Sequence, residues 1–191
     1  MIKRVENELE LAMFNGIWTT VWREKGYELE FAEHVLDRFV VMNEEGYCVG
    51  TSEIKPYDRD SSPLNEIAPF RDHPKVIASE GRVAEIDKIA ILGSYRGKGN
   101  MLPWILSSAV YSAEQHDMDY FVSLLEPVFL RALKISFKVP VERLGERLFY
   151  KGDYVVPVLF DMSAMYLNKQ RYEWLSNPEA INTTIEVKAG S

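Results

Sequence analysis

Apolar residues near the N-terminus recur at the spacing of one helical face. They fall every three or four positions over 5–22, and Gly26 ends the pattern. This period predicts one amphipathic helix and leaves open a break near Gly16, because glycine weakens a helix interior. The first residues are therefore expected to lead straight into an acidic helix.

Two β-rich segments follow, over 38–42 and 47–51, and Gly46 lies in the polar turn between them. Short β-branched and aromatic runs on both sides of such a turn predict a β-hairpin. The stretch 56–80 is rich in Pro, Ser and Asp, so we expect a loop that could hold one helical turn.

The segment 82–92 has the most informative strand pattern of the chain. Its residues alternate between two faces, as they do in a regular strand, and a glycine-rich turn over 93–99 follows directly. The alternation assigns Val83, Glu85, Asp87, Ile89 and Ile91 to one face and Ala84, Ile86, Lys88, Ala90 and Leu92 to the other.

The rest of the chain alternates between helix and strand signals. Apolar residues at helical spacing over 102–113, with Pro103 near the start, predict a second amphipathic helix. Because no repeat or linker divides the chain, we expect one α/β domain over 1–191, with a core from about 5 to 162 and a C-terminal helix and tail over 163–191. The further elements expected are strand 119–125, helix 127–137, strands 139–150 and 154–160, helix 162–174 and a tail past 177–178.

Composition narrows the class of protein. The 191 residues are 47% hydrophobic, which excludes a disordered chain, and no run of about 18 apolar residues could span a membrane. The net charge of −7 makes nucleic acid a poor partner. Because 1–6 show no basic and then apolar signal segment, we expect a cytoplasmic protein.

Metal and nucleophile chemistry find little support in the sequence. Cys48 is the single cysteine, so a disulfide framework and thiolate clusters are excluded. His34, His73 and His116 stand far apart without ligand spacing, and no metal is expected. A Gly-x-Ser-x-Gly nucleophile elbow is absent.

The turn between the predicted strand and the second helix favours anion binding. Gly97 and Gly99 allow backbone N–H groups to converge, Arg96 and Lys98 supply charge, and Asn100 stands at the start of the helix, whose N-terminus carries a partial positive charge. These features suit a pyrophosphate group. A glycine-rich turn with solvated basic residues is the alternative.

Two common phosphate motifs do not fit this turn. A Walker loop needs four residues between its first glycine and the Gly-Lys pair, but Gly93 and Gly97 enclose three. A dinucleotide fingerprint needs a third glycine, but Leu102 stands at that position.

The segment Tyr95-Arg96-Gly97-Lys98-Gly99 resembles the pyrophosphate loop of the GNAT acyltransferases, Arg/Gln-x-x-Gly-x-Gly/Ala, and the order of predicted elements is similar to theirs. The resemblance implies a GNAT-like fold, a central mixed twisted sheet flanked by helices. It also implies that coenzyme A binds through its diphosphate, held by Arg96, Gly97, Lys98, Gly99, Asn100 and Met101, where Met101 replaces a Gly or Ala. The backbone of Ile89, Ala90 and Ile91 would then pair with the pantetheine arm and polarise the thioester carbonyl.

Other segments resemble one branch of that superfamily. The stretches 14–22, 49–56 and 63–67 are similar to the acyl-homoserine-lactone synthases and the long-chain N-acyl amino acid synthases, which take acyl groups from acyl carrier protein or acyl-CoA. Glu85 matches their Glu-Ile/Leu-Ser-Arg pattern, whereas Asp87 and Lys88 depart from it, and Glu53 stands where the lactone synthases carry Arg. These departures favour a different amine acceptor.

Acyl transfer to an amine needs a base, a donor to the thioester carbonyl and a proton for the leaving thiolate. Glu85 and Asp87, two residues apart on one strand face, would each raise the pKa of the other on a partly desolvated face. We therefore expect Glu85 to act as the base and Asp87 to orient the amine or relay the proton. Ordinary ion pairs of these carboxylates with Lys88 or Arg82 are the alternative.

The general acid is not evident from the sequence. The tyrosine that GNAT enzymes usually carry after their fifth strand is missing from helix 127–137, where Leu133 occupies roughly that place. Tyr150, Tyr154 or solvent could supply the proton, since a thiolate leaves easily near neutral pH.

These observations together favour an N-acyltransferase that moves an acyl group from acyl-CoA or an acyl-carrier-protein thioester to a small-molecule amine by direct attack. Rivals are an acetyl-CoA-dependent N-acetyltransferase and a catalytically silent acyl-CoA-binding or regulatory protein of the same fold. A deep apolar cavity would favour the long-chain enzyme and a shallow one the acetyltransferase. An acidic carrier protein could dock on the basic residues Lys134, Lys138, Arg143 and Arg147.

Overall fold

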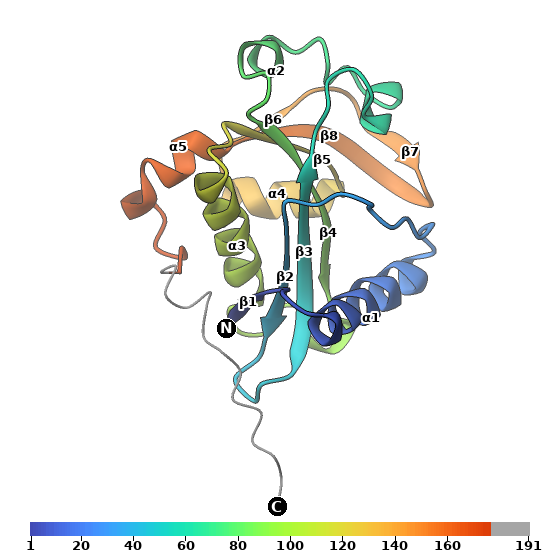
Figure 1. The fold of residues 1–191 in the computed structure, drawn as a ribbon, viewed down its shortest axis with the longest axis vertical. Helices are drawn as coiled ribbons and strands as arrows, with labels where there is room; N and C mark the ends of the chain where they lie inside the picture. Colours follow the sequence, from blue (N-terminus) through green and yellow to red (C-terminus); the bar gives the residue numbers. More distant parts are fainter. Residues whose placement is uncertain (177–191) are drawn as a thin grey trace, which may run out of the picture.

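The computed structural model describes residues 1–176, which form a mixed β-sheet with helices on both faces (Figure 1). Seven strands follow the order β1-β2-β3-β4-β5-β8-β6, and β7 pairs with β8. The strands are β1 (Ile2–Arg4), β2 (Asp37–Met42), β3 (Cys48–Pro56), β4 (Val83–Ile91), β5 (Tyr120–Leu125), β6 (Val141–Arg143), β7 (Leu148–Tyr150) and β8 (Asp153–Asp161).

Helices α1 and α3 cover opposite faces of the sheet (Figure 1). Phe39 and Val41 of β2 pack into the cluster beneath α3, whereas Val40 packs beneath α1, because successive strand residues point to opposite faces. The helices are α1 (Glu8–Lys25), α2 (Pro74–Ala78), α3 (Met101–Gln115), α4 (Pro127–Ile135) and α5 (Met162–Tyr166), with 3₁₀ turns η1 (Pro63–Glu66), η2 (Gly93–Tyr95) and η3 (Lys169–Arg171).

Helix α1 is continuous, so the break considered near Gly16 does not occur. The side chain of Asn7 caps its first turn by accepting from the Glu10 amide at 3.0 Å, and Gly26 ends it with a left-handed φ of 75°. The residues before Asn7 form β1 rather than leading straight into the helix. Three residues are too few to show a strand period, and β1 is recognisable from its pairing with β2.

The C-terminal half differs from the sequence prediction at two places. The strand expected over 139–150 is divided into β6 and β7, which pair with different parts of β8 on either side of Pro157. Proline has no N–H to donate to a ladder, and a Cβ at Gly145 would lie only 3.2 Å from the Pro157 ring. The closing helix ends at Tyr166 instead of continuing to 174, and the predicted tail past 177 lies outside the described residues.

Strand β4 contains a β-bulge that changes the predicted faces. Lys88 has a φ of 48°, and the register with β3 shifts between Thr51 and Glu53. Glu85 and Asp87 line a pocket on the α1 side, whereas Ile89 and Ile91 pack against the cluster on the α3 side. The expectation that all four share one face is therefore wrong, because strict alternation holds only while the register is regular.

Strands β4 and β5 are paired over a short length only. Their parallel pairing joins Val83, Ala84 and Glu85 to Tyr120, Phe121 and Val122. Beyond Glu85 the strands part, and this opening lies beside the candidate site. Among residues 1–176, no helix combines the length and apolar character needed to cross a membrane.

Candidate functional site

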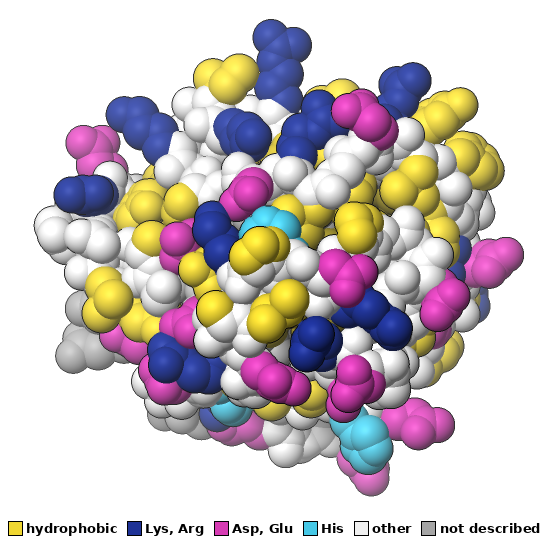
Figure 2. Space-filling view, turned by 90° about the horizontal axis from the view of Figure 1, so that it is seen from above, with side chains coloured by type: hydrophobic (Ala, Val, Ile, Leu, Met, Phe, Trp, Pro, Cys, Tyr) yellow, Lys and Arg dark blue, Asp and Glu magenta, His cyan; other side chains and the backbone are white. Residues whose placement is uncertain are grey.

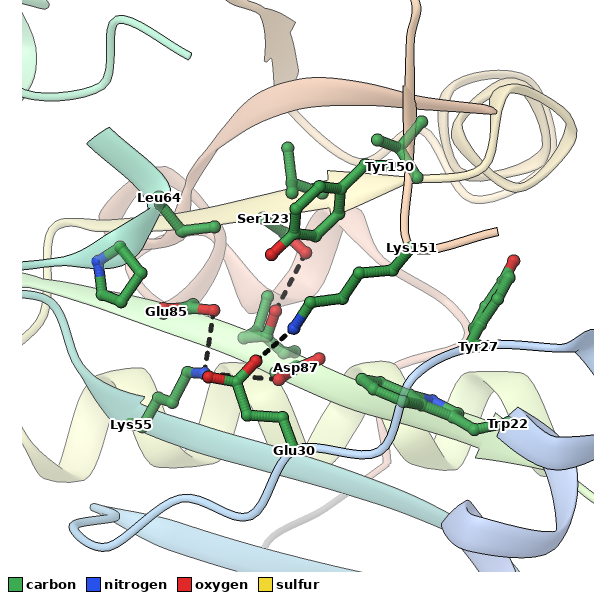
Figure 3. Close-up of a pocket in the computed structure, with 14 residues that line it drawn as sticks. Trp22, Tyr27, Glu30, Lys55, Leu64, Glu85, Asp87, Ser123, Tyr150 and Lys151 are labelled. Carbon is green, nitrogen blue, oxygen red and sulfur yellow. Dashed lines mark hydrogen bonds and ion pairs between the residues drawn. The ribbon is translucent and has the colours of Figure 1, made fainter. Parts of the chain in front are cut away.

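A pocket of about 120 Å³ lies on the α1 side of the sheet, where β4 and β5 part (Figure 3). Its floor comes from β3, β4 and β5, and its walls from the end of α1, the segment after it, η1 and the β7–β8 turn. The lining residues are Trp22, Tyr27, Glu30, Lys55, Pro63, Leu64, Glu85, Ile86, Asp87, Ser123, Leu124, Tyr150, Lys151 and Val155.

Glu85 and Asp87 meet at one ammonium group on the floor of the pocket. The Lys55 Nζ lies 3.0 Å from Glu85 Oε1 and 3.3 Å from Asp87 Oδ2. The two carboxylates therefore share Lys55 on the neighbouring strand rather than pairing with Arg82, which bonds Asp119 instead. Lys88 lies farther from Asp87, at 3.8 Å.

Burial raises the pKa of Glu85 to about 7, and only 9% of the residue is exposed. The charge of Lys55 acts against this rise, and the charges of Asp87 and Glu30 add to it. Desolvation is thus the main cause, ahead of the repulsion between the two carboxylates on which the sequence argument relied. A carboxylate with a pKa near neutrality can exchange a proton at physiological pH.

The free energy of unfolding is expected to fall by up to about 3 kcal/mol as the pH rises from about 4.5 to about 7. Over that window the folded protein keeps a proton on Glu85, because the pKa of Glu85 is raised, whereas the unfolded chain has lost it. The stabilisation that this proton gives is therefore complete below pH 4.5 and is lost as the pH rises through 7. Urea denaturation at pH 5 and pH 8 measures this change. Glu85→Gln should reduce the difference between the two pH values, and an unchanged difference would contradict the shift.

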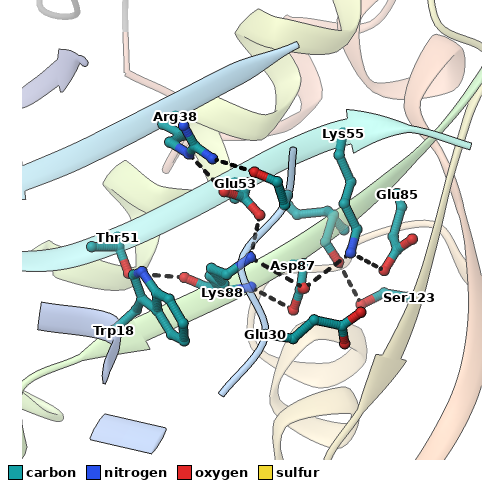
Figure 4. A network of polar contacts seen from close by, with 12 residues as sticks. Trp18, Glu30, Arg38, Thr51, Glu53, Lys55, Glu85, Asp87, Lys88 and Ser123 are labelled. Atoms are coloured by element: carbon teal, nitrogen blue, oxygen red, sulfur yellow. Dashed lines mark hydrogen bonds and ion pairs between the residues drawn. The ribbon is translucent and has the colours of Figure 1, made fainter. Parts of the chain in front are cut away.

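Lys88 and Glu53 both depart from the synthase pattern, and in the fold their opposite charges pair with each other. The ammonium of Lys88 pairs with Glu53 Oε1, and the guanidinium of Arg38 donates to Glu53 Oε2 at 2.7 Å (Figure 4). Lys88 is 3% exposed and Glu53 is 0% exposed. Lys88 also lies 5.0 Å from the ring centroid of Trp18 on α1. This buried triad, together with the bond from Thr51 Oγ1 to the Lys88 carbonyl at 2.8 Å, fixes the bulge beside the pocket.

An ion pair between Glu30 and Lys151 crosses the mouth of the pocket. Glu30 belongs to the segment between α1 and β2, and Lys151 belongs to the β7–β8 turn, so the pair joins two distant parts of the chain (Figure 3). The bond to Lys151 lowers the pKa of Glu30. Both side chains keep partial access to solvent, at 57% for Glu30 and 22% for Lys151.

The predicted anion loop is an exposed turn at the N-terminus of α3. The amides of Arg96 and Lys98 are bonded within the turn, at 3.4 Å and 3.2 Å. Within the described part of the chain, the amides of Gly97, Gly99 and Asn100 have no protein acceptor, and both glycines have left-handed φ values of 71° and 56°. Three donors at a helix start thus fit a diphosphate, and binding there stays a prediction.

The side chain of Arg96 is turned toward the protein. Its Nε donates to the Ile91 carbonyl at 2.9 Å, and its Nη2 lies 3.4 Å from Glu24. Ile89, Ala90 and Ile91 lie beyond the paired part of β4 and β5, so within residues 1–176 the edge of β4 that faces β5 has no partner strand there. The four strand steps from Asp87 to Ile91 cover about 13 Å between the pocket and the loop.

Of the two tyrosines considered as the general acid, only one lines the pocket. Tyr150 lines the pocket, whereas Tyr154 is about half exposed, meets Phe149 edge to face and lies beneath the guanidinium of Arg147. Leu133 is fully buried in the core.

Several pocket residues were missed by sequence reasoning. Glu30 and Lys151 stand in no motif, and Lys55 lies within the stretch 49–56 but was given no role there, because each of the three reaches the pocket from a different element. Trp22 of α1 lines this pocket, and Phe121 of β5 lines a separate apolar cavity.

The apolar cavity lies on the opposite side of the sheet, behind Ile86. It has a volume of about 20 Å³ and is lined by apolar residues such as Leu106, Leu133 and Phe160. On the same measure a single water molecule needs about 10–15 Å³, so this space holds about one water molecule and is shallow. The Ser123 hydroxyl donates to the Ile86 carbonyl at 2.9 Å across the gap between the strands.

No group of three or more His, Cys, Asp or Glu side chains within residues 1–176 is arranged to hold a metal ion.

No protein-family model matches the chain, and no curated protein matches its sequence. Solved structures match it well. FeeM, an N-acyl amino acid synthase from uncultured soil microbes, has a TM-score of 0.66 and 14% identity, over 91% of this chain and 92% of that chain. The AHL synthase LasI has a TM-score of 0.62 and 14% identity, over 88% and 93%. A putative N-acetyltransferase from Lactobacillus plantarum has a TM-score of 0.61 and 14% identity, over 85% and 97%.

The fold is therefore GNAT-like, as the order of elements and the loop at Arg96 predicted. The solved structures that share it include N-acyl amino acid and acyl-homoserine-lactone synthases, which confirms the suspected branch at the level of the fold.

Proposed function

We propose that this protein is an N-acyltransferase that moves an acyl group from an acyl-CoA or acyl-carrier-protein thioester to a small-molecule amine. The observation that carries the proposal is the buried Glu85 carboxyl, with a pKa of about 7, on the floor of a pocket beside the gap between β4 and β5. Among the residues that the structure describes, the edge of β4 beyond Glu85 is unpaired and the amides at the start of α3 are free, which supports a thioester donor on that side.

The reaction requires two protons to leave the acceptor nitrogen. Glu85 accepts the first when the ammonium becomes a free amine, and Asp87 and Lys55 hold the charge around it. The amine nitrogen then forms a bond to the carbonyl carbon as the C–S bond breaks. The second proton ends on the thiolate, through Tyr150 or solvent, and the products are an amide and a free thiol.

Turnover is measured directly as release of free thiol from acyl-CoA in the presence of a panel of primary amines. Amine-dependent thiol release supports the proposal. Binding of acyl-CoA without thiol release for any amine would instead favour the catalytically silent binding protein. The same assay with an acyl-carrier-protein thioester tests the second donor. Figure 2 shows Lys and Arg side chains gathered along one edge of the displayed face, and such an edge suits an acidic carrier protein.

Coenzyme A is expected to raise the melting temperature by about 5–10 °C at a concentration near 100 times its Kd, because a ligand that binds only the folded state stabilises it. Pantetheine at the same concentration is the matched control, since it lacks the diphosphate that Gly97, Gly99 and Asn100 would bind. An equal shift with pantetheine would contradict the assignment of the diphosphate to this loop. The melting temperature is measured by differential scanning calorimetry.

The size of the apolar cavity favours transfer of short acyl groups as a second candidate function. Behind Ile86 the open space is about 20 Å³, which is less than a long acyl chain needs. Thiol release with a series of acyl-CoAs separates the two candidates. A rate that falls from acetyl-CoA to longer chains supports the short-chain enzyme, and a rate that rises supports the long-chain enzyme.

A further inference from the structure

We propose that Lys55 is a site of self-acylation, at which the protein transfers the acyl group of its thioester donor to its own side chain when no acceptor amine is bound. The inference rests on the thioester donor and the base of the proposed function, and it adds a modification site. It follows from the position of the Lys55 amine, which is the position that an acceptor amine would need.

Lys55 is an amine that already lies beside the proposed base. It stands directly opposite Glu85 in the antiparallel pairing of β3 with β4. Its Nζ is 3.0 Å from Glu85 Oε1 and 3.3 Å from Asp87 Oδ2 (Figure 4). An acceptor amine must reach the same carboxylates to lose its proton. The other lysine among the described lining residues, Lys151, pairs with Glu30 at the mouth instead.

The Lys55 amine also lies beside the opening through which the donor would approach. Glu85 is the last residue of β4 that pairs with β5, and residues from both sides of the opening, such as Ile86 and Ser123, line the pocket (Figure 3). A thioester in this opening would meet an amine that the chain itself holds in place. Such proximity favours reaction, because no second molecule has to bind and be oriented.

The charges around Lys55 make this reaction slow. Burial acts to lower the pKa of Lys55, but the charges of Asp87 and Glu85 outweigh burial and raise that pKa. The amine therefore stays protonated until Glu85, whose pKa is about 7, accepts its proton. Because Lys55 reacts once per chain, a slow step still leads to complete modification when no acceptor competes.

The atoms balance as they do in transfer to a free amine. Glu85 takes one proton from the Lys55 ammonium, the neutral nitrogen forms a bond to the thioester carbonyl carbon, and the C–S bond breaks. The second proton that the nitrogen loses ends on the thiolate. The products are an amide on Lys55 and one free thiol for each modified chain.

This modification should block the pocket in which it forms. Acylated Lys55 has no charge, so Glu85 and Asp87 lose the ammonium that they share. The charge of Lys55 acts against the rise in the pKa of Glu85, and its loss should raise that pKa further and keep Glu85 protonated at pH 7. The acyl group also takes up part of a pocket of about 120 Å³. Self-acylation should therefore stop acceptor acylation while thioester is present and acceptor is scarce.

The test is mass spectrometry of the full chain after incubation with acetyl-CoA, octanoyl-CoA or an octanoyl-acyl-carrier-protein thioester and no amine. Intact mass gives the number of acyl groups per chain, and tandem mass spectrometry of peptides gives their positions. Lys75 is the internal control, because it lies outside the pocket and its side chain is 45% exposed, which favours uncatalysed acylation. With at least one donor, Lys55 should approach complete modification and react at least about 10-fold faster than Lys75.

Variants connect this modification with the pocket. Glu85→Gln should lower the initial rate of acylation at Lys55 by at least about 100-fold, as expected for loss of a general base, and leave the rate at Lys75 unchanged. Preincubation with the donor should reduce later amine-dependent thiol release in proportion to the modified fraction of Lys55, both in wild type and in the matched control Lys75→Arg. Lys55→Arg keeps the positive charge but removes the amine, so preincubation should not lower its rate below its own starting value.

Three results would overturn the inference: acylation spread over exposed lysines, acylation at Lys151 in place of Lys55, or a rate at Lys55 that Glu85→Gln leaves unchanged. If amines are acylated and Lys55 is not, the inference fails and the proposed function stands. If Lys55 is acylated and no amine is, the inference stands and transfer to a small-molecule amine fails. Absence of both reactions with all three donors contradicts both.

Discussion

Replacing Glu85 by glutamine should lower kcat for amine acylation by about 10²- to 10⁴-fold, the contribution typical of a general base. Glutamine keeps the size of the side chain and its place beside Lys55 but cannot accept a proton. KM for acyl-CoA should change little, because Glu85 lies away from the loop proposed to bind the diphosphate. Steady-state thiol release over pH 5–9 measures the effect, and wild-type kcat should rise through about pH 7 as Glu85 ionises.

Two further variants test whether the loss of kcat is specific to Glu85. Asp87→Asn should have a smaller effect on kcat, since Asp87 orients the amine in our proposal and keeps its place beside Lys55. Glu142→Gln removes an exposed carboxylate that does not line the pocket and should leave the pH profile unchanged. Full turnover of Glu85→Gln with a good acceptor would remove the assignment of Glu85 as the base.

Breaking the buried triad should cause the largest loss of stability. Glu53→Gln leaves the ammonium of Lys88 buried without its carboxylate, and loss of one partner of a buried pair typically costs about 3–5 kcal/mol. Urea denaturation at pH 7 measures the change in the free energy of unfolding. Glu142→Gln, whose ion pair with Lys75 is exposed, should cost less than about 1 kcal/mol.

A double variant separates the loss of the pair from the loss of packing. Glu53→Gln combined with Lys88→Met removes both charges, so it should recover part of the stability lost in Glu53→Gln. If Glu53→Gln is no less stable than Glu142→Gln, the triad does not fix the bulge of β4. Recovery of stability without recovery of kcat would show that the charges themselves position the strand beside the pocket.

Local patterns in the sequence were enough to predict several elements and one motif. The helical period of α3 and the alternation of β4 are carried by neighbours in the chain, and the structure has both elements within two residues of the predicted limits. The positions of Glu85 and Asp87 on one face follow from a separation of two residues in a strand. Such features depend on backbone geometry within one element.

Features that depend on pairing between elements were not predictable in the same way. The bulge at Lys88 exists because β3 and β4 change register, and it moves Ile89 to the other face. The division of the strand expected over 139–150 depends on Pro157 in the partner strand. A sequence period treats each strand alone and therefore contains no register information.

The sequence by itself determined the GNAT-like order of elements, the glycine-rich loop before α3 and the two carboxylates on β4, because short-range backbone preferences and side-chain spacing control these features. Only the tertiary structure decided that Lys55 joins the two carboxylates, that Glu53 and Lys88 neutralise each other and that Glu30 meets Lys151 across the pocket. The physical reason is that ion pairing and desolvation depend on distances between residues far apart in the chain, and folding alone sets those distances.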